Sequence, residues 1–586
     1  MKLSRGVHGA LAALALFALA CNNDDITGPP QPLGVTATAT GNATVNVAWT
    51  SVAGDSSYTI ERAPGATGGT FVEVGSVVAP ATVGPVKFTD TGLSTTSTYR
   101  YRVIAHKNGK ASSPSTEAVV TTLTSASASV TINTDLTTSR TLYADTSYLL
   151  SGFIHVTNGA TLTIQPGTTI KGDFNTLGSS IMIMRGAKIN AVGTAAAPIV
   201  FTSSRAPGQR QPGDWGGLLF VGNAIDNRSG VVNVEGTGTD GSAVVGGKNY
   251  FVQYNGGNTA TDNSGTMQYV RVEFAGFAPI QDQEFNSFTF AAIGSGTRFS
   301  YLESLCPLDD AFEFFGGGFD IDHIIAYETA DDMFDMSEGW VGRMQYLIGI
   351  NTVQLTPRTG AGFYSVDIEG IENDGCNGTG CDNGFDQQPF TIPLVANFTM
   401  IGCGSSTCVG ASGGHGMMLR RGTGGYYVNG VVVRWPTDGI SLRDNSSYVR
   451  GGSTATPSAT ADLQLKNIYF AEDNNLLFQA NTATPATQFS LDPTANALTL
   501  AANTVTAASL FVKIPAVGAA PTDTSAFDFT PAAGSAIATG GLATLAGAVA
   551  TKGGTFITGT AFQGGAPLAG TLGARWWAGW TIYARN

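Results

Sequence analysis

Two acidic segments contain the residues of this sequence that are best suited to chemistry. Segment 309–313 (DDAFE) is followed 22 residues later by segment 331–335 (DDMFD). If the segments stack at the strand spacing of about 4.8 Å, each pair of carboxylates repels by about 3.5 kcal/mol at an effective dielectric constant of about 20. Ca²⁺ binds through oxygen ligands and would neutralise them, so we expect a calcium site here. The six residues are Asp309, Asp310, Glu313, Asp331, Asp332 and Asp335.

Other arrangements of these carboxylates remain open at the level of sequence. They cap turn amides, extend into water, where the repulsion falls to about 1 kcal/mol, or pair with Arg343. A second acidic segment further along the chain is another candidate for binding a cation. Its residues are Asp367, Glu369, Glu372, Asp374, Asp382 and Asp386.

The same carboxylates are compatible with two kinds of catalysis on polysaccharides. In a calcium-dependent lyase they hold the metal, and Arg343 or His323 is the base that removes a proton next to a substrate carboxylate. In a glycosidase, two carboxylates about 5 to 9 Å apart carry out hydrolysis. The sequence contains no lyase or hydrolase signature, and His415, in a Gly-Gly-His-Gly run, is typical of a turn residue. We therefore favour binding and keep catalysis as the alternative.

Short strands and turns, rather than helices, must position these side chains. Charged residues make up 12% of the chain and glycine supplies 76 positions, a composition that excludes a charged helical bundle or coiled coil. From residue 125 onward, strands of three to six residues end at Gly, Pro or Asn, as in 159–170 and 186–202. We predict that 125–586 forms a right-handed parallel β-helix, in which successive coils stack on one another.

The 22-residue offset is close to the length of one such coil. It places Tyr301 over His323 over Gln345, and it stacks Phe312 on Phe334 in the interior. This register is the basis for expecting the acidic residues to meet.

The start of the chain has the pattern of an export signal. A positively charged beginning and an apolar stretch end in small residues before Cys21. This resembles a bacterial lipobox and implies cleavage before Cys21 and acylation, which would hold the mature chain at a membrane. We expect a signal peptide at 1–21, a tether at 22–32 and a location in the bacterial cell envelope, at the outer membrane or cell surface. An ordinary secretory signal is the alternative.

Export favours disulfides among the remaining cysteines. Cys376 and Cys381 enclose one short loop, and Cys403 and Cys408 enclose another. We therefore predict two local disulfides and a buried thiol at Cys306. A zinc ion bound by the four paired cysteines is the alternative, but their spacing is wider than is usual for zinc.

Residues 33–124 are predicted to form a separate antiparallel sandwich of about seven strands. The positions of Trp49, Leu93 and Tyr99 in this segment resemble those in a fibronectin type III domain. The resemblance implies a core tryptophan at Trp49 and a tyrosine corner at Leu93 and Tyr99. Such a domain spaces or presents other domains, so we assign it no chemistry.

The stretch from about 130 to 586 resembles a family of exported bacterial β-helix lipoproteins. The resemblance implies a pectate-lyase-like solenoid at the cell envelope and transfers no established activity. It rests on the two acidic segments and on Trp215-Gly-Gly, 262–276, 370–374, 419–423 and 576–580. At the end of the chain, Trp576, Trp577 and Trp580 are expected to cover the last coil, and a motif for docking to a secretion partner is the alternative.

Charge narrows the choice of partners. With 30 Lys and Arg against 43 Asp and Glu, the formal charge of −13 argues against nucleic-acid binding. We predict an all-β, membrane-anchored exported protein that presents a β-helix for binding or adhesion to glycans or other extracellular matter. A calcium-dependent polysaccharide lyase or glycoside hydrolase is the alternative, and Ca²⁺ is the only cofactor expected.

Overall fold

The chain divides into two compact units, Met1–Ala126 and Ser127–Asn586. The computed structural model describes residues 28–39, 43–80, 82–123, 129–237, 244–245, 248–249, 251–254, 257–280, 283–451, 462–478, 497–571 and 573–585. The predicted signal peptide with Cys21 lies outside the described residues. Among the described residues, no helix combines the length and apolarity needed to cross a membrane.

The first unit is an antiparallel β-sandwich of the fibronectin type III class. One sheet has the order β1-β2-β5, and the other has the order β4-β3-β6-β7 with β8 beside β6. Trp49 packs edge-on against Tyr58 in the core, and Ser94 donates its N–H to the hydroxyl of Tyr99 at 3.0 Å. The strands are β1 (Thr36–Ala39), β2 (Val45–Thr50), β3 (Ser57–Pro64), β4 (Val72–Val78), β5 (Pro85–Asp90), β6 (Thr98–Lys107), β7 (Lys110–Ala111) and β8 (Ala118–Thr121).

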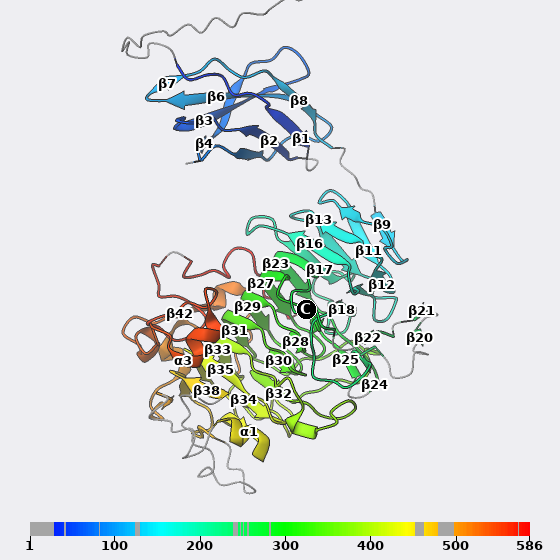
Figure 1. Cartoon of the computed structure of the whole chain (residues 1–586), viewed down its shortest axis with the longest axis vertical. Coiled ribbons are helices and arrows are strands. Elements are labelled where there is room, and N and C mark those ends of the chain that lie inside the picture. Colours follow the sequence, from blue (N-terminus) through cyan, green and yellow to red (C-terminus); the bar gives the residue numbers. More distant parts are fainter. Residues whose placement is uncertain are drawn as a thin grey trace, which may run out of the picture. The chain divides into compact units, whose positions relative to one another are not determined.

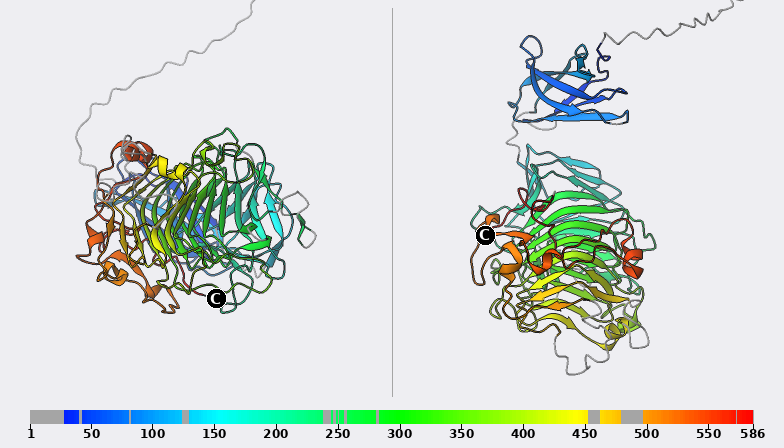
Figure 2. Two further views of the ribbon diagram at one scale, coloured as in Figure 1. Left: turned by 90° about the horizontal axis from the view of Figure 1, so that it is seen from below. Right: turned by 90° about the vertical axis from the view of Figure 1, so that its left-hand side faces the viewer.

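The second unit is a parallel β-helix, which confirms the predicted fold class. Its coils build a 17-stranded sheet and a nine-stranded sheet, and the strands of both pair in parallel with strands of neighbouring coils (Figures 1 and 2). The nine-stranded sheet consists of β12 (Phe153–Val156), β15 (Ser180–Ile183), β18 (Gly217–Val221), β26 (Phe288–Ala291), β28 (Phe312–Phe315), β30 (Phe334–Ser337), β32 (Ile371–Asp374), β34 (His415–Arg420) and β37 (Asp438–Leu442).

Four neighbouring strands of the 17-stranded sheet each carry a residue in the left-handed backbone region, and the side-chain rings of these residues stack on one another. The residues are Tyr269, Tyr301, His323 and Tyr346, with φ values of 51°, 54°, 54° and 65°. Residues other than glycine rarely adopt such values. The sheet consists of β9 (Ser129–Ile132), β10 (Arg140–Leu142), β11 (Ser147–Leu150), β13 (Thr161–Ile164), β14 (Thr169–Gly172), β16 (Lys188–Val192), β17 (Ile199–Ser203), β23 (Gly265–Glu273), β27 (Arg298–Leu305), β29 (Asp320–Tyr327), β31 (Arg343–Ile350), β33 (Leu394–Ile401), β35 (Gly425–Val428), β36 (Val431–Val433), β38 (Leu463–Lys466), β39 (Tyr469–Ala471) and β40 (Thr499–Leu500).

Shorter elements connect or cover these sheets. The described helices are all short, as expected for a chain with little α-helix. The remaining strands are β19 (Val232–Asn233), β20 (Val244–Val245), β21 (Lys248–Asn249), β22 (Gln253–Tyr254), β24 (Phe277–Ile280), β25 (Gln283–Phe285), β41 (Phe511–Lys513) and β42 (Asp528–Pro531). The helices are α1 (Asn445–Arg450), α2 (Ala507–Leu510), α3 (Gly547–Gly553), η1 (Gly384–Asp386), η4 (Thr524–Ala526) and η5 (Ala536–Ala538).

Stacked phenylalanines form the interior of the central coils. Phe312 lies over Phe334 in the parallel register, with ring centroids 5.5 Å apart and planes inclined by 8°. Phe288 continues the row on the other side, 4.9 Å from Phe312. The predicted 22-residue register therefore holds between these coils.

The register changes by one residue in the next coil. Ile324 pairs with Leu347, an offset of 23, so His323 stacks on Tyr346 and not on Gln345 as predicted. A one-residue insertion is enough to move a different side chain into the row, because adjacent residues of a strand point to opposite faces.

The C-terminal segment packs against the side of the β-helix. Trp576 contacts the rings of Tyr301 and His323, and Trp580 contacts Tyr269. These contacts lie on strands β23 to β29, in the middle of the 17-stranded sheet. The expectation that the C-terminal tryptophans cover the last coil is therefore wrong.

The stacked interior generates a prediction about stability. Phe334 is fully buried, so Phe334→Ala should lower the free energy of unfolding of the β-helix unit by about 3 to 5 kcal/mol. Urea titration followed by tryptophan fluorescence measures this unit, because six of the seven tryptophans belong to it. Phe363→Ala, at an exposed phenylalanine, is the control and should change stability by no more than about 0.5 kcal/mol. Equal effects of the two substitutions would contradict the stacked interior.

Candidate functional site

A cavity of about 870 Å³ lies beside strands β28 to β34 of the nine-stranded sheet. Thirteen of the residues that line it are Asp or Glu, and four are Arg. We call it the acidic cavity. Its charged lining residues are Glu235, Glu284, Asp309, Asp310, Glu313, Asp331, Asp332, Asp335, Glu338, Asp367, Glu369, Glu372, Asp374, Arg228, Arg420, Arg421 and Arg443.

Strand alternation accounts for one row of these carboxylates. Glu313 pairs in register with Asp335, and Asp335 pairs with Glu372. In each strand the neighbouring residues face the core, so these three side chains point outward on one face. Figure 1 shows their strands β28, β30 and β32 in adjacent coils. The strand spacing of about 4.8 Å brings the three carboxylates close together.

Carboxylates at the preceding turn form a second row and cap backbone amides. Asp332 donates its N–H to Oδ1 of Asp310 at 2.8 Å, and Glu369 donates its N–H to Oδ1 of Asp332 at 3.1 Å. Asn286 occupies the same place one coil earlier and accepts from the N–H of Asp310 at 3.0 Å. The expected turn caps are therefore present, but each uses only one oxygen of its carboxylate.

Several of these carboxylates lie close enough together to hold a cation. Three overlapping groups have oxygens within 4.8 Å of one another: Asp309, Asp310 and Asp331; Asp310, Asp332 and Asp335; Asp331, Asp332 and Glu369. Oε1 of Glu369 and Oδ1 of Asp335 are buried and have no hydrogen-bond partner among the described residues. Since an unpaired buried oxygen is costly, this arrangement favours a bound cation or proton.

Burial also changes the acidity of these groups. The pKa of Asp310 is raised well above its usual range, first by burial and then by the negative charge of Asp309. Burial and then the charge of Glu369 raise the pKa of Asp332 in the same way. The cavity therefore favours carboxylates that are neutralised.

Among the carboxylates that line the cavity, Glu338, Glu372 and Asp374 form ion pairs with its arginines, Glu338 with Arg228. Arg420 binds the carboxylates of Glu372 and Asp374, with its Nε 2.9 Å from Oδ1 of Asp374, and Arg421 also pairs with Asp374. Burial lowers the pKa of Arg420, but the charges of Asp374 and Glu372 more than offset it and raise the pKa. Among the described residues, no ion pair involves Asp309, Asp310 or Asp331.

Arg443 differs from the other three arginines of the cavity, because no carboxylate of the described residues forms an ion pair with it. Its Nε donates to Oγ of Ser441 at 3.0 Å, and its Nη2 lies 3.2 Å from Nε2 of His415. The other ring nitrogen of His415 lies 2.9 Å from Oδ2 of buried Asp438. His415 thus begins a buried strand and supports Arg443, and the prediction of a simple turn residue is wrong.

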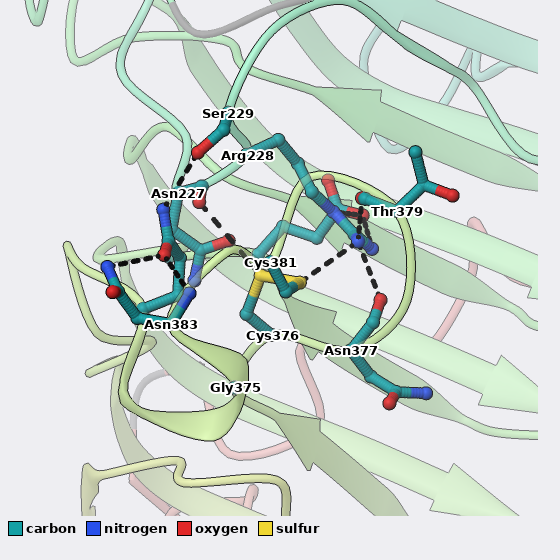
Figure 3. The surroundings of a disulfide bond; sticks show 12 residues. Asn227, Arg228, Ser229, Gly375, Cys376, Asn377, Thr379, Cys381 and Asn383 are labelled. Atoms are coloured by element: carbon teal, nitrogen blue, oxygen red, sulfur yellow. Dashed lines mark hydrogen bonds and ion pairs between the residues drawn. A yellow bond between two sulfur atoms is a disulfide. The ribbon is translucent and has the colours of Figure 1, made fainter.

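A disulfide loop closes part of the cavity wall. Cys376 and Cys381 are bonded, with Cα atoms 5.7 Å apart, and Figure 3 shows Arg228 directed at their loop. Arg228 donates to the backbone oxygens of Asn377 at 2.6 Å and Thr379 at 2.7 Å, and its Nε lies 2.6 Å from Glu338. The loop and the segment around Arg228 are thereby fixed together.

The other cysteines in the described part of the chain are also as predicted. Cys403 and Cys408 form a second disulfide, and Cys306 is a buried free thiol. The disulfides exclude the zinc alternative in this state, because a bonded sulfur is not a thiolate ligand.

The structure gathers all six predicted carboxylates in the acidic cavity. It adds part of the second acidic segment, namely Asp367, Glu369, Glu372 and Asp374, which was expected to be a separate site. Asp382 and Asp386 do not line the cavity.

The two weak catalytic candidates lie elsewhere. His323 stacks between Tyr301 and Tyr346 on the 17-stranded sheet, at ring centroid distances of 4.5 and 4.8 Å. Arg343, also on that sheet, forms a bidentate ion pair with Asp320 at 2.7 Å. Neither residue lines the acidic cavity, so neither is placed to act as its base.

Sequence reasoning missed five charged cavity residues, namely Glu235, Glu284, Glu338, Arg228 and Arg443. Glu235 lies in the long connection between β18 and β23, Glu284 lies in β25 between β23 and β26, and no period in the sequence points to either residue. Arg443 directly follows β37 and would have been found by extending the coil register beyond β32.

The acidity of the cavity generates a prediction about pH. The unfolded chain binds protons at these groups only below about pH 4, whereas the folded chain retains them at higher pH, so stability is lost as the pH rises. We expect the Tm of the metal-free protein to fall as the pH rises above about 4, and Asp332→Asn to reduce that fall. Calorimetry across this range is the measurement, with Asp382→Asn as a control that removes an exposed carboxylate outside the cavity. A pH profile of Asp332→Asn identical to that of the wild type would contradict the prediction.

Comparison with known proteins concerns the two units separately. The chain is similar to an Fn3-like protein from Clostridium thermocellum, at 31% identity over 16% of this chain and 90% of that chain, with a TM-score of 0.14. It is also similar to the FN5 domain of Drosophila Lar, at 23% identity over 16% of this chain and 97% of that chain, with a TM-score of 0.14. No curated protein matches the sequence.

The β-helix unit matches a family model. The model describes a pectate-lyase-like β-helix domain and matches residues 134–511, which is more than half of the chain. The protein therefore belongs to the pectate-lyase-like β-helix family.

Proposed function

We propose that the protein is an exported glycan-binding protein that binds its ligand at the acidic cavity with the help of Ca²⁺. The observation that carries this proposal is the excess of buried carboxylates over arginines in the cavity, together with the unpartnered oxygen of Glu369. Binding here is favoured over adhesion through a flat surface, because the charged residues converge on one concave site.

The donor set fits Ca²⁺. This ion takes six to eight oxygen ligands in flexible geometry, and the three carboxylate groups share Asp310, Asp331 and Asp332. Carboxylates alone, without His or Cys, are typical of a hard cation. When bound, the ion would offer remaining coordination positions to hydroxyl or carboxylate oxygens of a glycan.

The rim of the cavity supports a glycan as the ligand. Phe363 and Tyr364 line the cavity and are 54% and 45% exposed, so solvent reaches both residues. Exposed aromatic rings pack against the apolar faces of sugars, while the carboxylates and Arg443 supply polar contacts. Membership of a pectate-lyase-like family adds support by analogy.

A calcium-dependent lyase or glycosidase is the second candidate. It is favoured by Arg443, which has no carboxylate partner among the described residues, and by the raised pKa of Glu372, which is caused by burial and then by the charge of Asp374. Carboxyl groups with shifted pKa values next to a cation are characteristic of such active sites. Polysaccharide cleavage that is lost in both Asp332→Ala and Arg443→Gln would establish this candidate in place of simple binding.

We also propose that the mature chain is anchored in the cell envelope through an acylated Cys21, a residue outside the described part of the chain. The support is the signal-like sequence before it. A Cys21→Ser variant should no longer incorporate labelled fatty acid, and continued labelling would refute the anchor.

The proposed function generates a prediction about Ca²⁺. At free Ca²⁺ about 100-fold above its Kd, binding stabilises the folded chain by about 2.7 kcal/mol. Removal of Ca²⁺ should therefore lower the Tm of the wild type and weaken its binding to polygalacturonate or to a neutral polysaccharide such as cellulose. The measurements are calorimetry and affinity electrophoresis with and without Ca²⁺.

Two double variants make this test specific. Asp310→Asn with Asp332→Asn should abolish the response to Ca²⁺, because both residues belong to the cation groups. Asp382→Asn with Asp386→Asn removes the same charge from exposed positions outside the cavity and should leave the response intact. If the Tm and the glycan binding of the wild type are the same with and without Ca²⁺, the proposed role of the ion is excluded.

A further inference from the structure

A second pocket, of about 600 Å³, has the opposite electrostatic character. It is formed by the turn at 205–212 after β17, the loop at 353–356 after β31, and Arg585. Arg205, Arg210 and Arg585 line it, and no Asp or Glu does. In a chain with a net charge of −13, such a local concentration of positive charge requires an explanation.

The carboxylates beneath this pocket compensate its arginines only weakly. The closest nitrogen-to-oxygen distances are 3.5 Å from Arg205 to Asp214, 3.4 Å from Arg210 to Glu273 and 3.8 Å from Arg585 to Glu328. Elsewhere in the chain, arginines form closer ion pairs, such as the 2.8 Å contact between Arg62 and Asp90.

Each of these carboxylates is also occupied by other donors. Asp214 accepts from Oγ of Ser203 at 2.6 Å and from the N–H of Gln211 at 3.1 Å. Glu273 accepts from Nε of Arg271 at 3.1 Å, so two arginines share its single charge. These carboxylates therefore do not fully neutralise the positive charge of the arginines that line the pocket.

Neighbouring groups hold the arginine side chains in place but do not use all of their N–H donors. The guanidinium of Arg205 lies over the ring of Phe174 at 4.6 Å, and that of Arg358 lies over the same ring at 3.9 Å. Nε of Arg210 donates to the backbone oxygen of Arg205 at 3.2 Å. The Nη2 groups of Arg205 and Arg210 have no hydrogen-bond partner in the part of the chain that the structure describes.

We propose that this pocket is a binding site for an oxoanion, either the carboxylate of an acidic sugar or an inorganic sulfate. A guanidinium group that is held in place presents N–H donors side by side, and these match the oxygens of a carboxylate or a sulfate. This site is separate from the acidic cavity and does not depend on the glycan-binding proposal. The loop that follows β31 contributes to both, through 353–356 to the pocket and through 363–367 to the cavity.

Isothermal titration of the full, metal-free chain at constant ionic strength tests the site. The probes are galacturonate, sodium sulfate and neutral galactose, titrated in chloride buffer. We expect galacturonate, sulfate or both to bind, and galactose not to bind. Binding of galacturonate alone identifies an acidic sugar as the source of the anion, and binding of sulfate identifies an inorganic ion. Binding of galactose as strong as that of galacturonate would refute the proposal, as would a lack of binding by both anions.

Variants connect the binding to the pocket. Arg205→Gln with Arg210→Gln should weaken anion binding at least tenfold. Because those arginines also contact buried carboxylates, Gln354→Glu is the second variant; it places a negative charge on an exposed lining residue without touching the ion pairs, and it should weaken binding as well. Arg298→Gln, at an exposed arginine outside the pocket, is the control and should bind like the wild type. Unchanged binding in Gln354→Glu would overturn the assignment.

Use of metal-free protein separates this test from the calcium proposal. Anion binding that persists in the Asp310→Asn, Asp332→Asn double variant supports an independent site. Loss of anion binding in that variant would show that the anion occupies the acidic cavity and would refute the arginine pocket.

Discussion

Parallel pairing of strands at a fixed spacing is the constraint on which the rest of this structure depends. Because each coil lies in register on the next, any residue type that recurs at the coil period forms a continuous row. Inside the β-helix this rule stacks Phe312 on Phe334, which is favourable. On the outside the same pair of coils stacks Glu313 on Asp335, which is unfavourable unless something neutralises the charges. The core and the acidic cavity are two results of one register.

Compensation of that charge is uneven along the cavity. Arg420 and Arg421 pair with Glu372 and Asp374, whereas Asp310 and Asp332 each accept a backbone N–H at one carboxylate oxygen and form no ion pair among the described residues. The folded chain thus holds charges that its own described residues do not balance. A proton, a metal ion or a positively charged part of a ligand can complete the balance, and each does so in a way that depends on pH or on concentration.

The sequence was sufficient to predict the fold class, the stacked phenylalanines and the six central carboxylates, because all of them follow from local strand patterns and a visible 22-residue repeat. It failed where the period is interrupted. One added residue replaced Gln345 by Tyr346 in its row, and the insertion between β31 and β32 made Glu369 look like part of a separate site. The repeat also shows which residues stack in a row, but it does not show on which sheet of the β-helix a row lies. It therefore could not show that His323 and the acidic residues lie on different sheets. The contacts of the C-terminal segment follow no repeat in the sequence, so a search for repeats could not predict them.

The route of that C-terminal segment has a consequence for how the chain acquires its structure. Ile582 donates its N–H to the buried carboxylate of Glu303 at 3.1 Å, 279 positions earlier, and the hydroxyl of Tyr583 binds buried Glu328. A solenoid whose coils contact only their neighbours can assemble progressively during synthesis. Here the central coils retain unsatisfied carboxylates and uncovered aromatic rings until the last residues arrive, and closing so long a loop is slow. The β-helix is therefore complete only when the C-terminal residues have packed, and a chain cut short by a few residues would expose the middle of this unit and not merely its end.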